Sequence, residues 1–269
     1  MEYLDLGQMS RSSAAYFQQL LQSAGLSFRK WSSNSPEILE SIPFDLRDVR
    51  SVLDLDSSAS VKSLGLKWTP STDELGFHVP KWNVECVVTK RIALSDSARL
   101  YDPLELVGPV IVLAKYFMQE LWEYKKTWDE PLEDDLLNRW LQFRGELAAA
   151  DSSTVPRWVI SISKPILLEA HGFSDASLRA YGACIYLRAV SECGDISVHL
   201  LTSKSKVAPL GISKKQKTIS LPRPELSGTL LLSHLFQKVK QSLKVEIKCY
   251  YWVDSTVVLH WLAVTKIRP

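Results

Sequence analysis

The sequence lacks any long apolar run. The segment Val110–Ala114, which Lys115 ends, is among the longest, whereas a membrane-spanning helix needs about 20 predominantly apolar residues. The N-terminal region has no apolar stretch behind a basic start, so no secretory signal is expected. We therefore expect neither a membrane protein nor a secreted one, and the predicted location is cytoplasmic.

Cysteine is also scarce. The chain has 4 cysteines, and none of them forms a Cys-x-x-Cys pair or has a histidine at zinc-finger spacing. This excludes a disulfide scaffold and a zinc finger. Isolated cysteines of this kind are typical of reduced, mostly buried thiols, which favours a reducing compartment.

Charge of one sign is not in excess over the whole chain. Lys and Arg number 32 and Asp and Glu 30, in 269 residues of which 46% are hydrophobic. These values are typical of one or two globular domains with a substantial core. Locally, residues 199–248 contain many basic residues and few acids. Such a stretch favours either a polyanion partner or a solvated basic face, and charge alone favours the second.

The N-terminal part alternates between helical and strand patterns. Its spacing of apolar residues predicts helices over residues 12–24, 107–128 and 132–150, and strands over 26–31, 61–69 and 75–84. Asp151–Pro156 is the best candidate for a linker between two domains.

The C-terminal part follows a different order. Strands are predicted over 159–173, 181–190 and 196–203, then a basic loop over 203–218, a helix over 222–243, a strand over 245–253 and a helix from 255. Three strands followed by a helix, a strand and a helix predict a mixed α/β sheet with flanking helices.

Three acids stand where these predicted elements meet. Asp175 follows the first strand, Glu225 begins a helix, and Asp254 lies where a strand gives way to a helix. A charge that borders a core needs a partner or a metal, and converging carboxylates are the ligands that hard cations prefer. Each acid also has a purely structural interpretation: a turn residue, a first-turn helix acid and an N-cap, respectively.

At these acids the sequence resembles a ribonuclease H domain of the retroelement type. The matching segments are Phe173–Ser177 (FSDAS), Gly182–Tyr186 (GACIY), Arg223–Leu226 (RPEL) and Val253–Thr256 (VDST). The resemblance implies that Asp175, Glu225 and Asp254 are catalytic and hold two Mg²⁺ (or Mn²⁺) ions. It also implies cleavage of the RNA strand of RNA–DNA hybrids.

The N-terminal half is similar to the segment that follows the polymerase active site in BEL/Pao-type retrotransposon Pol polyproteins, a region known as the Pao retrotransposon peptidase family. The similarity lies in Leu26–Asn34, Leu64–Trp68, Leu94–Leu106 and Glu120–Pro131. It implies that residues 1–150 are part of a reverse-transcriptase palm and thumb, and that residues 157–269 form a ribonuclease H-like domain. The rest of a Pol polyprotein, in retroelement particles, becomes an expected partner.

Three features that such proteins use are missing. The sequence has no Tyr-x-Asp-Asp motif, so no polymerase activity is expected. Asp175 precedes Ala and Ser rather than the Thr-Gly of an aspartic peptidase, which disfavours that activity. The family's domain also continues to a fourth metal ligand, which we expect this sequence to lack. An inactive nucleic-acid-binding remnant is therefore the main alternative to a ribonuclease.

Basic residues close to the acids are candidates for phosphate contacts. They are Lys204, Lys206, Lys214, Lys215, Lys217 and Arg223. Contacts of this kind are nonspecific and weaken with salt. A solvated loop is an equal alternative for the lysines, and Arg223 has the alternative of pairing with Glu225.

The aromatic and imidazole side chains near the acids have simpler interpretations. Trp252 and Trp261 flank Asp254, and core packing is expected for both rather than a platform for nucleic-acid bases. His171, His199 and His260 are expected to be structural rather than metal ligands.

Overall fold

A computed structural model describes most of the chain: residues 11–48, 61–63, 66–79, 82–83, 86–100, 102–124, 127–150, 152–162, 164–209, 221–243 and 247–264. The chain divides into two compact units. One comprises Met1–Phe77 with Ser153–Trp158, and the other comprises His78–Ser152 with Val159–Pro269. The assignment of residues 1–150 to a palm and thumb and of 157–269 to a separate domain stays a prediction.

The first unit contains two helices and a small antiparallel sheet. The helices are α1 (Arg11–Ser23) and α2 (Pro36–Glu40), followed by a 3-10 turn at Phe44–Leu46. The strands are β1 (Val61–Ser63), β2 (Leu66–Thr69), β3 (Glu74–Phe77) and β4 (Thr154–Pro156), adjacent in that order. β4 lies within the expected linker and pairs with β3.

Two strand predictions for this unit were wrong. Residues 26–31 form no strand: among the described residues, the segment pairs only through an isolated bridge between Trp31 and Arg47. The expected single strand over 61–69 is two strands, β1 and β2, which pair antiparallel with Val61 opposite Trp68. The segment does have β structure, as its local pattern predicted, but its two halves pair with each other and so form two strands instead of one.

The second unit begins with three helices. They are α4 (Lys90–Arg99), α5 (Gly108–Glu123) and α6 (Asp134–Ala150). α4 was not predicted, although Thr89 is its N-cap and accepts a hydrogen bond from the backbone N–H of Ile92. α5 ends at Glu123 with Tyr124 as its C-cap, so it is shorter than the expected helix over 107–128.

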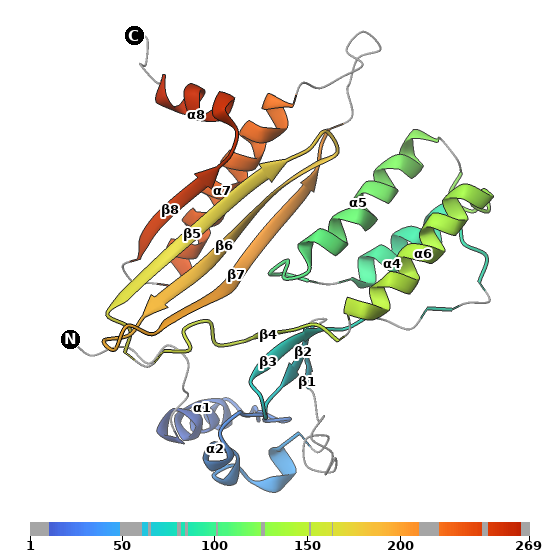
Figure 1. Cartoon of the computed structure of the whole chain (residues 1–269). Coiled ribbons are helices and arrows are strands. Elements are labelled where there is room, and N and C mark those ends of the chain that lie inside the picture. The colour runs from blue at the N-terminus through green and yellow to red at the C-terminus, as the bar shows by residue number, and fades with distance from the viewer. Residues whose placement is uncertain are drawn as a thin grey trace. The chain divides into compact units, whose positions relative to one another are not determined.

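The larger sheet of this unit confirms the predicted element order (Figure 1). Its strands are β5 (Leu167–Ala176), β6 (Ala180–Val190), β7 (Ile196–Val207) and β8 (Lys248–Val253), with α7 (Pro222–Leu243) before β8 and α8 (Thr256–Ala263) after it. The spatial order is β7-β6-β5-β8. β8 runs parallel to β5, while β6 pairs antiparallel with both β5 and β7.

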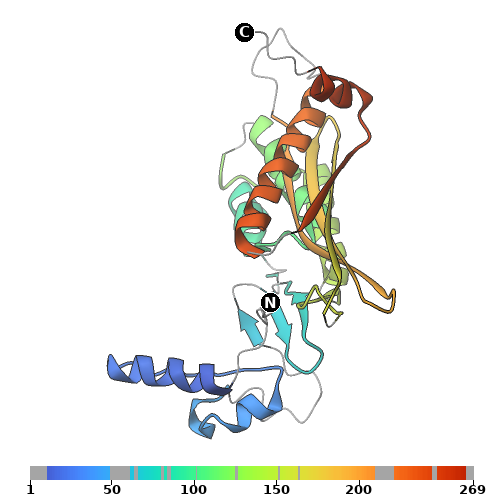
Figure 2. The same ribbon diagram turned by 90° about the vertical axis from the view of Figure 1, so that its left-hand side faces the viewer.

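One face of this sheet packs on α7 (Figure 2). Ala170, Ile185 and Leu187 point to that face and form a core with Leu232 and Phe236 of the helix. Gly172 faces the same way, and a Cβ there would lie 2.6 Å from Leu232 Cδ1. The glycine therefore allows α7 to approach β5 closely.

The opposite face of the sheet carries larger, partly exposed side chains. Phe173 and Trp252 lie side by side on β5 and β8, and 44% and 51% of their surfaces are exposed. The expectation that Trp252 and Trp261 are core residues was wrong, since Trp261 on α8 is also exposed. Trp252 lies on an edge strand, so one side of its indole has no neighbouring strand to cover it.

None of the helices in the described ranges is both long and apolar enough to cross a bilayer. The 4 cysteines are free, but the expectation that they are mostly buried was wrong: Cys193 is exposed and the other three are partly exposed.

Candidate metal centre

Asp175 lies near the C-terminal end of β5, close to the start of α7. Its Oδ1 accepts a hydrogen bond of 2.7 Å from the N–H of Ala176. The turn that follows is stabilised by Ser177, whose Oγ accepts hydrogen bonds from the N–H groups of Arg179 and Ala180. The interpretation of Asp175 as the residue that makes the turn is therefore not needed.

Glu225 lies in the first turn of α7 and is buried, with 8% of its surface exposed. Its backbone N–H donates to the carbonyl of Leu221. Three residues further along the helix, a Cβ on Gly228 would lie 3.3 Å from the backbone oxygen of Asp175. The missing side chain at Gly228 thus lets this end of α7, and Glu225 with it, come close to β5.

Asp254 connects β8 to α8. The side chain of Ser255, not that of Asp254, caps α8 by accepting from the N–H of Val258 at 3.4 Å. The N-cap interpretation of Asp254 is therefore wrong, and its carboxylate is not used by the helix it precedes.

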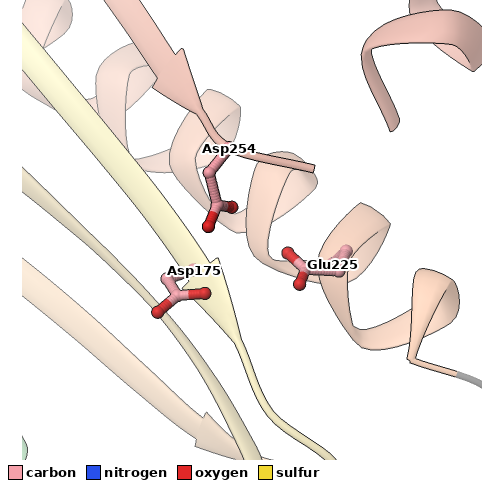
Figure 3. A group of neighbouring side chains, drawn as sticks. All are labelled: Asp175, Glu225 and Asp254. Carbon is pink, nitrogen blue, oxygen red and sulfur yellow. The ribbon is translucent and has the colours of Figure 1, made fainter. Parts of the chain in front are cut away.

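The three carboxylates converge although they come from three separate elements (Figure 3). One ligand oxygen from each of Asp175, Glu225 and Asp254 lies within 4.8 Å of the others. Parallel pairing of β5 and β8 brings the ends of these strands together, and the start of α7 supplies the third acid. Carboxylate oxygens at this spacing suit a hard divalent cation.

Within the described residues, no lysine or arginine forms an ion pair with the three acids of this centre. Burial raises the pKa of Glu225 above its usual value, and the negative charges of Asp254 and Asp175 raise it further. Glu225 Oε2 is buried and has no hydrogen-bond partner within the described part of the chain. An orphaned buried oxygen between two other acids is a position that a cation would satisfy.

A cavity of about 690 Å³ opens beside the acids. Asp175 and Asp254 lie at its edge, Phe173 and Trp252 line it on the sheet, and Gly108 and Val112 line it from α5. The rings of Phe173 and Trp252 have their centroids 6.3 Å apart with an angle of 14° between their planes. The acids and the aromatic pair therefore share one cavity.

The predicted basic residues do not gather into one loop. β7 extends beyond its expected end at Ser203, so Lys204 and Lys206 lie on a strand. Lys204 forms an ion pair of 2.6 Å with Glu105, while Lys206 is exposed. Arg223 is exposed in the first turn of α7, two residues before Glu225, and no ion pair between the two is found in the described structure. Lys214, Lys215 and Lys217 lie outside the described residues.

The histidines near the centre are not among the three converging ligands. His171 accepts at Nδ1 from Trp252 Nε1 at 3.3 Å, and its Nε2 lies 3.4 Å from Glu169. His199 contacts Ser161 at 3.1 Å. His260 is exposed on α8. These contacts fit the structural roles expected for His171 and His199.

Sequence reasoning missed Glu105, a buried acid that joins α5 to the sheet. Its carboxylate accepts hydrogen bonds from Lys115 Nζ at 2.9 Å and from Ser205 Oγ at 2.9 Å, besides its pair with Lys204. The N–H of Ser203 donates to the carbonyl of Leu104, so the segment before α5 covers part of the edge of β7. In the sequence, Glu105 is only a single acid between Leu104 and Leu106. That pattern does not identify partners as distant in sequence as Lys204 and Ser205.

Comparison with known proteins gives a family match and distant likenesses to solved structures. A family model described as Pao retrotransposon-like RNaseH-like domain matches residues 89–255. The matched segment thus runs from the N-cap of α4 to the N-cap of α8. No curated protein matches the chain.

The solved structures similar to this chain include two foamy viral proteins. The foamy viral protease-reverse transcriptase dRH in complex with ds DNA has 11% identity and a TM-score of 0.41, over 76% of this chain and 32% of that one. The foamy viral protease-reverse transcriptase in complex with dsDNA has 13% identity and a TM-score of 0.36, over 75% and 38%. This chain therefore spans about a third of the length of either protein.

Proposed function

The chain belongs to the Pao retrotransposon-like RNaseH-like domain family, and on that premise we propose that it is a metal-dependent ribonuclease acting on the RNA strand of RNA–DNA hybrids. The observation that carries the proposal is the convergence of Asp175, Glu225 and Asp254 within 4.8 Å. Acids that converge from a strand end, a helix start and a strand–helix junction are what phosphodiester hydrolysis by metal ions requires.

The residues present fit a divalent cation of the Mg²⁺ or Mn²⁺ type. All three ligands offer oxygen, Glu225 supplies an orphaned buried oxygen, and Asp175 and Asp254 line an open cavity. Two ions held here would lower the pKa of a bound water and stabilise the leaving oxygen of the cleaved phosphodiester.

The chain's own groups have separable roles in this proposal. Asp175, Glu225 and Asp254 hold the cations, and burial of Glu225 among like charges favours occupation of the site over an empty one. Arg223 and Lys206, both exposed, supply positive charge for phosphates of the bound nucleic acid. Other segments of a Pol polyprotein would be its physiological partners.

Cleavage of a labelled RNA–DNA hybrid tests the proposal. The purified chain is incubated with Mg²⁺, Mn²⁺ or EDTA, beside Asp175→Asn and Glu225→Gln. We expect cutting of the RNA strand alone, dependent on the metal and lost in both variants. Glu192→Gln, an exposed acid in the turn between β6 and β7, is the matched control and should cut like the wild type.

The alternative is a binding protein without catalysis. It predicts no cutting by a folded chain that still binds hybrids, with an affinity that falls as salt increases. Retained cutting in Asp175→Asn would instead show that the site is assigned to the wrong residues.

A further inference from the structure

The cavity beside the acids is lined on the sheet by two aromatic side chains, here called the aromatic floor, which metal binding does not explain. Phe173 and Trp252 occupy paired positions on β5 and β8, two residues before Asp175 and Asp254 respectively. Two residues of a strand span about 6.6 Å. One pair of aromatic rings and one pair of carboxylates therefore follow each other along the same two strands, about one nucleotide's reach apart.

We propose that this cavity binds unpaired nucleotides next to the phosphate held at the acids, with Trp252 and Phe173 as the surface that contacts their bases. The inference rests on the proposed function and narrows its substrate to nucleic acid with a short single-stranded segment beside the hybrid. Such segments occur at hybrid ends and at junctions.

The size of the cavity favours unpaired nucleotides over a duplex. At about 690 Å³ it falls within the range of pockets that enclose a small organic molecule, which suits one or two nucleotides. A paired duplex is wider and hides the faces of its bases. A flat apolar base with an anionic phosphate matches an aromatic floor that ends in a cation-binding centre.

The aromatic floor is held in place by the surrounding side chains. The indole N–H of Trp252 donates to His171, and the His171 ring stacks on Tyr250 with centroids 4.9 Å apart and an angle of 11°. Phe173 in turn contacts Tyr186 edge to face. Ordered rings lose little conformational freedom when a ligand binds, which favours binding.

The wall of the cavity opposite the sheet is also fixed. Gly108 and Val112 at the start of α5 line it. The preceding turn is attached to β7 through Glu105, which pairs with Lys204 and Lys115. The ion pair between Glu105 and Lys204 therefore joins the two elements that bound the cavity on this side.

Binding of matched oligonucleotides to the full chain tests the inference. The probes are an RNA–DNA hybrid with blunt ends, the same hybrid with two-nucleotide overhangs, and the overhang hybrid with abasic overhangs. Affinities are measured by fluorescence anisotropy with Ca²⁺ in place of Mg²⁺. We expect the overhang bases to increase affinity about fivefold to a hundredfold over the abasic probe, the range of base–aromatic stacking.

Trp252→Leu should remove that difference between normal and abasic overhangs. Trp261→Leu is the matched control, because Trp261 is an exposed tryptophan on α8 that does not line the cavity. It should keep the difference. Equal affinity for normal and abasic overhangs in the wild type, or equal loss in both variants, overturns the inference.

A second pair of variants keeps the test decisive if Trp252→Leu does not fold. Val112→Glu places a negative charge in the wall of the cavity, whereas Leu113→Glu places it on an exposed neighbour outside the lining. The first should weaken binding of the overhang probe and the second should not. Equal effects of the two overturn the inference.

The binding result is distinguishable from a failure of the proposed function. An overhang effect that depends on Trp252, in a chain that cuts nothing, supports the cavity assignment and removes the catalytic proposal. Metal-dependent cutting lost in Asp175→Asn, without any overhang effect, supports the catalytic proposal and removes the cavity assignment.

Discussion

Glu105 and Glu225 lie almost equally deep in the same unit, with 3% and 8% of their surfaces exposed. The side chains around Glu105 are positively charged, whereas those around Glu225 are negatively charged. Glu105 is held by Lys115 and Lys204, whereas Glu225 faces Asp175 and Asp254 and leaves one oxygen without a hydrogen-bond partner in the described structure.

The pKa values of the two side chains respond accordingly. Burial on its own would raise the pKa of Glu105, but hydrogen bonds from Lys204, Lys115 and Ser205 lower it below the usual value. Burial and two like charges raise the pKa of Glu225. Burial by itself therefore does not mark a candidate functional carboxylate, whereas burial beside other negative charges does.

The largest difference is expected in stability when each charge is removed. Glu105→Gln leaves two lysines without their counter-charge and should lower the free energy of unfolding by about 1–3 kcal/mol. Glu225→Gln, measured in EDTA, relieves repulsion and should leave that free energy unchanged or increase it. Urea unfolding followed by circular dichroism measures both, and equal losses would show that the two environments do not differ.

The two variants should also differ in how much Mg²⁺ stabilises them. At a Mg²⁺ concentration ten times its dissociation constant, the wild type should gain about 1.4 kcal/mol of stability. Thermal unfolding should show this gain in Glu105→Gln and not in Glu225→Gln. A gain that persists in Glu225→Gln would place the ion elsewhere.

The pH dependence of stability should have opposite signs at the two sites. The contribution of Glu105, whose pKa is lowered, is complete above its unfolded value and is lost as the pH falls through its folded value. The contribution of Glu225, whose pKa is raised, is complete below its unfolded value and is lost as the pH rises through its folded value.

Urea unfolding across a pH series, in EDTA, checks these signs. Relative to the wild type, Glu105→Gln should lose less stability as the solution is acidified below its usual pKa of 4.5. Glu225→Gln should lose less as the pH rises above the same value. Parallel profiles for all three proteins would contradict the assignment of the shifts.

The smallest expected effect concerns two lysines of β7. Lys206 is exposed, so Lys206→Gln should reduce the slope of log affinity against log salt by about 1 when hybrid binding is measured. Lys204 forms an ion pair with Glu105, so Lys204→Gln should lower the free energy of unfolding and change the salt slope less than Lys206→Gln does. A larger change of slope in Lys204→Gln would show that Glu105 does not hold this lysine when nucleic acid binds.

The sequence predicted the larger sheet well because the pattern there is local. In β5 and β6, buried residues that pack toward α7 alternate with more exposed ones, and turn residues separate the two strands. The three acids stand at strand and helix boundaries, and this allowed their convergence to be expected. Their distances and the orphaned oxygen of Glu225 depend on how closely α7 packs, which Gly172 and Gly228 control.

What the sequence did not predict depends on distant partners. Lys204 was assigned to a loop because the run that follows is basic and contains Pro and Gly. In the structure Lys204 pairs with Ala183 of β6, and hydrogen bonds to Leu104 and Glu105 hold the other edge of the strand. Trp252 was assigned to the core because tryptophan is usually packed there. Its exposure follows from the edge position of β8, which only the strand order reveals.

The parallel pairing of β5 with β8 has a consequence for the order in which the protein is assembled. Parallel neighbours need a crossover, and here β6, β7 and α7 all intervene before β8 can join β5. A growing chain therefore exposes Asp175 early, without Asp254 beside it. The three acids converge only when β8 has been synthesised and docked, so binding of the proposed ion would report completion of the sheet during biosynthesis.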